Sequence, residues 1–152
     1  MKLLNTHTSE YYLSLFELSR FKVTKNRIGG HYKGDLLVSR ICDFNDPEVH
    51  WSTDKFVFSQ LIKTPEINFL LEVPVLNQQV PDKCIKIVID VLSNLVKLDQ
   101  QALKILNIPA QLNAIYITEK DIAFDYVPDF NGGCEMSIVY SDDGELFCEG
   151  YC

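Results

Sequence analysis

The sequence predicts an α+β fold: an antiparallel β-sheet with a central helical segment and a C-terminal β-meander. Two runs rich in β-branched and aromatic residues lie on either side of Thr64-Pro65. Apolar residues then recur at helical spacing after Pro81, and residues 112–151 alternate between apolar and polar side chains. A chain of 152 residues has the usual size of one domain, so we expect residues 1–152 to form a single domain.

The N-terminal part of the chain mixes helix and strand signals. Residues 9–19 fit a short helix capped by Thr8 or Ser9, although their leucines do not settle helix against strand. Residues 34–44 have the composition of a strand. The polar stretch over residues 43–54 predicts a loop.

The middle of the chain predicts a hairpin followed by helices. Residues 55–62 and 66–73 have the composition of two paired strands. Pro81 suits the first turn of a helix over residues 85–96, because its missing N–H costs nothing there. The same residues also alternate in part, so that a strand stays open as an alternative. We expect Asp99 to cap a second short helix.

The C-terminal region gives the clearest pattern. Apolar and polar residues alternate over four stretches, which are residues 112–118, 122–126, 135–140 and 145–151. Glycine-containing turns occur at Asn131-Gly132-Gly133 and at Asp142-Asp143-Gly144. These signals predict a four-stranded antiparallel meander that closes the fold.

The net charge of the chain limits the classes of partner that it can bind. It holds 21 acidic and 14 basic side chains, and its net charge is −7 at pH 7. This balance argues against binding to nucleic acid or to an anionic membrane, because both require cations. It is compatible with a basic protein partner. No stretch approaches the ~20 apolar residues of a membrane span and no signal peptide is recognisable, so we expect a cytoplasmic protein.

Motifs for catalysis, cofactors or metals are missing from the sequence. Two acidic loops resemble calcium sites, but Glu48 and Cys134 stand at their sixth positions, where such a loop needs glycine. We therefore predict no cofactor, no metal site and no enzymatic activity. The alternative is a small enzyme in which His31 or His50 pairs with a cysteine.

We predict structural roles for the cysteines and for the one tryptophan. The five cysteines are an odd number without a Cys-x-x-Cys pair, which favours reduced thiols over a disulfide framework. They are Cys42, Cys84, Cys134, Cys148 and Cys152. We expect Trp51 to pack against the core, with an exposed contact residue as the alternative.

Strand alternation in the meander predicts a carboxylate-rich face. If Ile122, Phe124 and Tyr126 point toward the core, the residues between them point away. The same rule applied to the later strands groups five carboxylates with two aromatic side chains, which interfaces favour. The expected partner-binding residues are Asp121, Asp125, Glu135, Glu145, Phe147, Glu149 and Tyr151. The alternatives are that helices cover this face, or that the last strand has the opposite parity.

The closing segments resemble those of a bacterial protein family. They are Ile115-Tyr116-Ile117, Ile122-Ala123-Phe124-Asp125-Tyr126 and the run from Ser137 through Asp142-Asp143-Gly144-Glu145. Together they are similar to the ending of immunity proteins of polymorphic or contact-dependent toxins. The resemblance covers the C-terminal half only, and it implies no catalytic residues.

The resemblance implies a cytoplasmic inhibitor that occludes a cognate toxin. Many such toxins are basic nucleases, which an acidic protein would be steered to and could cover. Two other classes stay open at this point: the small enzyme using histidine and cysteine, and a structural subunit whose sheet face forms a homodimer.

Overall fold

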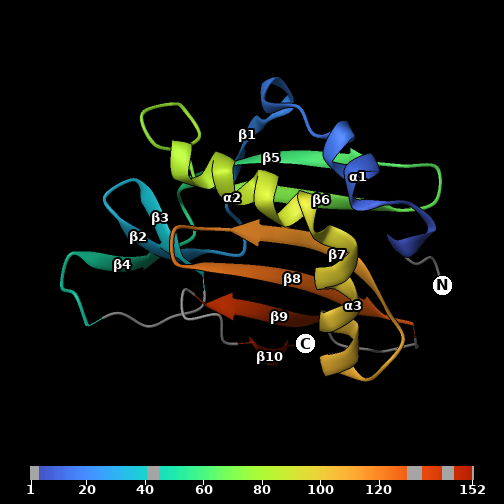
Figure 1. The fold of residues 1–152 in the computed structure, drawn as a ribbon. Helices are drawn as coiled ribbons and strands as arrows, with labels where there is room; N and C mark the ends of the chain where they lie inside the picture. Colours follow the sequence, from blue (N-terminus) through green and yellow to red (C-terminus); the bar gives the residue numbers. More distant parts are fainter. Residues whose placement is uncertain (1–3, 41–44, 130–134, 142–145, 152) are drawn as a thin grey trace.

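The computed structural model describes residues 4–40, 45–129, 135–141 and 146–151, with side chains described up to residue 129. These residues form a seven-stranded sheet, a three-stranded sheet and three α-helices (Figure 1). The arrangement confirms the α+β class. The described residues include no helix that is both long and apolar enough to span a membrane.

The large sheet has the strand order β1-β5-β6-β7-β8-β9-β10. All neighbouring strands in it are antiparallel except β6 and β7, which run parallel. Its strands are β1 (Lys22–Lys25), β5 (Phe56–Lys63), β6 (Asn68–Val73), β7 (Ala110–Ile117), β8 (Asp121–Pro128), β9 (Glu135–Ser141) and β10 (Leu146–Tyr151). The predicted hairpin corresponds to β5 and β6, and the predicted meander to β7 through β10, so both predictions are confirmed.

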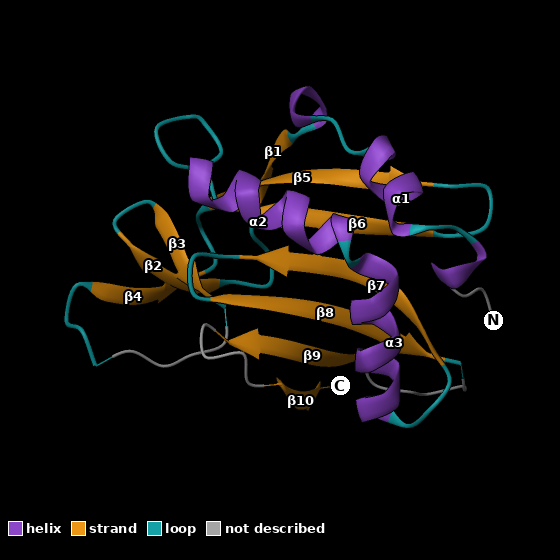
Figure 2. Ribbon diagram, in the orientation of Figure 1, coloured by secondary structure: helices purple, strands orange, loops and turns teal. Residues whose placement is uncertain are grey.

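The helices cover one face of the large sheet (Figure 2). They are α1 (Ser9–Leu15), α2 (Asp82–Ser93) and α3 (Leu95–Leu106), with two short 3-10 helices, η1 (Leu4–Thr6) and η2 (Leu18–Arg20). Thr8 caps α1, since its side-chain oxygen accepts a hydrogen bond from the Tyr11 amide at 3.2 Å. The helices α2 and α3 form the crossover that a parallel pair of strands requires.

Residues 85–93 belong to α2 and residues 95–96 to α3, with a turn at Asn94, so the helical alternative left by the sequence is confirmed. The buried residues of α2 are Cys84, Val88, Val91 and Leu92. These positions recur at the spacing of one helical face, and that face packs on the sheet. The partial alternation along this stretch is therefore incidental.

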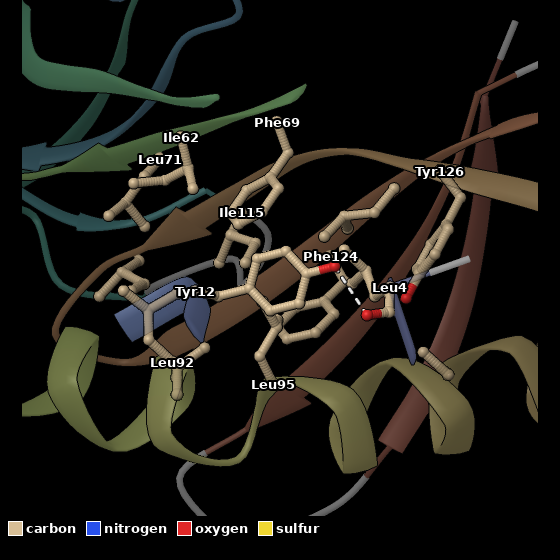
Figure 3. Packing of buried hydrophobic residues seen from close by; sticks show 14 of the residues in the cluster. Leu4, Tyr12, Ile62, Phe69, Leu71, Leu92, Leu95, Ile115, Phe124 and Tyr126 are labelled. Atoms are coloured by element: carbon tan, nitrogen blue, oxygen red, sulfur yellow. Dashed lines mark hydrogen bonds between the residues drawn. The ribbon is translucent and has the colours of Figure 1, made fainter. Parts of the chain in front are cut away.

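The main core lies between the helices and the large sheet. Figure 3 shows Phe69, Ile115 and Phe124 of the sheet facing Leu92 and Leu95 of the helices, and all five are fully buried. Tyr12 of α1 also enters this core, where its hydroxyl donates a hydrogen bond to the Leu4 carbonyl at 2.6 Å (Figure 3). This bond satisfies the buried hydroxyl and fixes η1 against α1.

Asp99 is not a helix cap, contrary to the prediction. It lies inside α3, which begins at Leu95, and its carboxylate is buried against β8. Tyr126 donates its phenolic hydrogen to Asp99 Oδ1 at 2.6 Å. The preference of aspartate for helix starts suggested a cap, but this bond across the core holds it in the interior instead.

A second, smaller sheet lies against the opposite face of the large sheet. It has the order β3-β2-β4, with β2 (Gly30–Lys33), β3 (Leu36–Ser39) and β4 (Val49–Ser52). The predicted strand over residues 34–44 corresponds to β3 alone, and residues 41–44 lie outside the described residues. The predicted loop over residues 43–54 contains β4, whose pairing with β2 overrides its polar composition.

The small sheet is fixed to the large one by a buried polar network. Arg40 donates to Asn26 Oδ1 at 2.9 Å and to Glu72 Oε1 at 3.3 Å, and its guanidinium lies 4.7 Å from the centre of the Tyr116 ring. Ser39 donates a hydrogen bond to Asp121 Oδ2. Contacts therefore reach β6, β7 and β8 from the end of β3.

Candidate binding groove

The structure places the predicted acidic residues of β8 in the interior. Asp121 is 4% exposed and Asp125 is fully buried. The predicted alternation is correct, since Phe124 and Tyr126 are in the core under the helices. The predicted exposure of the two aspartates is wrong. Ser39 and Thr118 donate to the Asp121 carboxylate, and Asn113 donates to Asp125 Oδ2 at 3.3 Å.

For Asp121, the physical reason for this correction is the small sheet. Strand alternation distinguishes the two faces of a strand, but it does not tell whether a second layer covers the outer face. Here Ser39 meets Asp121 although the two are 82 positions apart in the sequence.

The other predicted residues fall on the last two strands or outside the described residues. Strand pairing sets Phe147 opposite Val139 and Glu149 opposite Ser137. It also sets Tyr151 opposite Glu135, so the predicted residues of β9 and β10 are neighbours in register. Glu145 lies outside the described residues. Binding by this set of residues stays a prediction.

A different surface gathers exposed apolar side chains in a hollow. Four large apolar residues there are exposed: Leu18 at 49%, Val23 at 56%, Phe56 at 55% and Leu76 at 39%. They line two adjoining hollows of about 660 and 330 Å³, which share Gln78 as a common wall. We call the two hollows together the β1–β5 groove.

The β1–β5 groove lies on the helix-covered face of the large sheet, beyond the part that the helices shield. Val23 of β1 pairs with Phe58 of β5, so both side chains project from this face. Phe58 packs against the core, whereas Val23 and Phe56 are left open. The smaller hollow continues past Phe58 to Ile85 at the start of α2.

One wall of the groove is a tight turn between β6 and α2. Asn77 and Gln78 have left-handed backbone angles, with φ of 53° and 64°. The Leu76 amide donates to the Gln79 carbonyl at 2.8 Å, and the Gln79 amide donates to the Leu76 carbonyl at 3.1 Å. Two consecutive left-handed residues closed in this way form the two-residue turn of a β-hairpin. The turn holds Leu76 and Gln78 in the wall of the groove.

The groove is apolar in its floor and acidic at its margins. Among the described residues, its lining includes the carboxylates Asp35, Asp54 and Asp82 and one cation, Lys55. Lys55 Nζ lies 2.8 Å from Asp35 Oδ1, and this bond lowers the pKa of Asp35 and raises the pKa of Lys55. The described lining residues include no histidine, cysteine or serine. Its chemistry therefore suits binding of a mixed apolar and charged surface.

The histidines and the described cysteine lie elsewhere. His31 of β2 meets Trp51 of β4 edge to face at 5.1 Å between ring centres, and His50 is exposed on β4. Cys84 is buried in α2, and burial raises the pKa of its thiol to about 11. A nucleophilic cysteine needs the opposite shift. No group of three or more histidine, cysteine or acidic side chains within the described residues could hold a metal ion.

Trp51 is 54% exposed, so the prediction that it packs in the core is wrong. Its ring lies over Gly29, where an added Cβ would come within 2.6 Å of Trp51 Cζ2. Gly29 also has a φ of +81°, which side chains rarely adopt. The adjacent glycines Gly29 and Gly30 were the sequence signal that another group packs closely against the backbone at this point.

Sequence reasoning missed the β1–β5 groove entirely. Phe56 and Phe58 belong to one alternating run, and nothing local tells which of them the helices cover. Leu76, directly before the polar run Asn77-Gln78-Gln79, was the available signal.

Comparison with models of protein families, with curated proteins and with solved structures found no significant match. The resemblance of the C-terminal half to toxin-immunity proteins therefore stays a prediction.

Proposed function

We propose that this chain is a protein-binding protein whose partner docks in the β1–β5 groove. The observation that carries the proposal is the exposure of Leu18, Val23, Phe56 and Leu76 along one concave surface. Contiguous apolar exposure with a polar margin is typical of interaction sites. Most of the described lining residues are apolar, and none of them is a histidine, cysteine or serine beside the carboxylates, which supports binding over catalysis.

The specific role we propose is that of an immunity-type inhibitor, acting in the cytoplasm, that occludes a basic, nuclease-like toxin. The net charge of −7 supports this role, because an acidic protein is attracted to the cationic surface that a nuclease needs. The resemblance of the closing strands to immunity proteins supports it as well. The proposal moves the contact surface from the β8 aspartates, which are buried, to the groove.

Genes beside the one that encodes this chain allow a direct test. Each neighbouring product is expressed in a host cell alone and together with this chain, and growth is measured. An immunity protein should restore growth against one toxic neighbour and bind it in isothermal titration calorimetry. If a neighbour arrests growth and this chain neither restores it nor binds the product, the inhibitor role is rejected.

A further inference from the structure

The carboxylates of the β1–β5 groove are divided between its two hollows. Asp35 and Asp54 line the larger hollow, and Asp82 lines the smaller one. Asp35 is already bonded to Lys55 at 2.8 Å. Asp54, two residues before β5, and Asp82, in the first turn of α2, are both exposed. Each hollow thus combines apolar walls with an accessible negative charge.

We propose that the groove receives a cationic, apolar segment of the partner protein. Its apolar side chains would pack on Val23, Phe56 and Leu76, and its lysine or arginine side chains would lie beside Asp54 and Asp82. This inference rests on the proposed protein-binding function and specifies the partner's chemistry.

Charge complementarity selects this occupant over two others. An acidic segment would place carboxylates against Asp54 and Asp82, and like charges in contact are unfavourable. A second copy of this chain would bring another net charge of −7 toward the first. Lys55 lines the larger hollow and interacts with both Asp35 and Asp54, so the described charged residues of that hollow, two aspartates and one lysine, still sum to −1. Lys22 and Lys25 of β1 are not among the described lining residues.

Two synthetic peptides serve as probes of this chemistry. In one, leucine alternates with lysine; in the other, glutamate replaces each lysine. Fluorescence anisotropy measures their binding to the full chain at low and at moderate salt. The lysine peptide should bind, with an affinity that falls as salt rises, and the glutamate peptide should not.

Matched variants locate the binding to the groove. Phe56 and Leu61 lie on the same strand and are 55% and 54% exposed, but they lie five positions apart and so face opposite sides of the sheet. Phe56→Ser should weaken binding of the lysine peptide by about tenfold or more, which corresponds to losing one buried aromatic contact. Leu76→Ser should weaken it too, whereas Leu61→Ser should leave it unchanged.

A second pair of variants tests the charges. The double variant Asp54→Asn with Asp82→Asn should weaken binding at low salt and reduce its salt dependence. Asp90→Asn, on the exposed side of the same helix α2 as Asp82, is the control and should change neither.

Several results would overturn the inference. If the two peptides bind equally well, the groove does not select a cationic segment. If Leu61→Ser weakens binding of the lysine peptide as much as Phe56→Ser does, the peptide does not bind in the groove. Self-association of the wild type that Phe56→Ser abolishes would make a second copy the occupant. The growth assay tests the function separately. If the Phe56→Ser variant still restores growth, the groove is not the binding site, but the protein-binding role stands.

Discussion

At the scale of single residues, Asp99 stands out because it is an acid inside the core. Burial raises the pKa of Asp99 to about 6, and the hydrogen bond from Tyr126 partly opposes this. The folded chain therefore binds a proton between about pH 4 and pH 6 that the unfolded chain has released. Stability from this group is present at low pH and is lost as pH rises through that window.

We expect Asp99→Asn to remove this pH dependence. A pKa raised from 3.8 to about 6 corresponds to about 3 kcal/mol of stability lost at neutral pH. An asparagine can still accept the Tyr126 hydrogen bond, so the variant should be more stable than the wild type at pH 7 by about 1–3 kcal/mol. Urea denaturation at pH 4 and at pH 7 measures the difference.

The comparison between the two proteins isolates Asp99 from other carboxyls. Burial also raises the pKa of Glu72, which contributes a slope of the same sign to both proteins. Asp90→Asn changes an exposed carboxyl on α2 and should leave the slope intact. A slope unchanged in Asp99→Asn would show that Asp99 is not the responsible group.

At the scale of elements, the small sheet depends on the buried network at the end of β3. The Arg40 and Glu72 side chains are 6% and 10% exposed. Removing one partner of such a pair leaves a buried charge uncompensated, whereas replacing both with apolar residues can be nearly neutral. The pair therefore fixes the position of the small sheet more than it adds net stability.

We expect Arg40→Met to destabilise the chain by about 3 kcal/mol, and addition of Glu72→Met to recover most of this loss. The exposed pair of Lys33 with Glu48, at 3.2 Å, is the control, and Lys33→Met should cost less than about 1 kcal/mol. Trp51 is the single tryptophan and lies on β4, so its fluorescence reports on the small sheet.

Loosening of the small sheet alone should shift the Trp51 fluorescence transition to lower urea than the circular dichroism transition. Equal costs for Arg40→Met and Lys33→Met would contradict a structural role for the buried network.

At the scale of the whole molecule, the core between the helices and the large sheet is extensive. Of the residues whose side chains the structure describes, nineteen buried ones belong to this one cluster. A chain of this length can bury roughly 68–70% of the surface of its unfolded form. Stability should therefore come from packing.

We expect chelation with EDTA to leave the melting temperature unchanged, because the core is large and the described residues include no cluster of side chains that could hold a metal ion. Differential scanning calorimetry with and without the chelator measures this. A drop of several degrees would indicate a structural metal.

The features that could be predicted from the sequence are those that depend on residues close together in the chain. The hairpin β5–β6, the helical segment and the meander β7–β10 were predicted, because alternation and helical spacing are patterns of residues that are close together in the sequence. The exposures of Trp51, Asp121 and Phe56 were not, since each depends on which distant segment covers it. The groove is defined jointly by β1, β5, η2 and the turn before α2, and no local pattern unites them.

The parallel pairing of β6 with β7 makes completion of the sheet wait for the second half of the chain. During synthesis β5 and β6 emerge together, but Leu71 meets its register partner Ile115 only after both helices have been made. Until then the growing chain presents an open apolar strand edge, which is prone to join other chains. We expect fragments of the chain that end before β7 and are released from the ribosome to aggregate. We also expect chaperones that bind nascent chains to bind this one after β6 has been made and before β7 has.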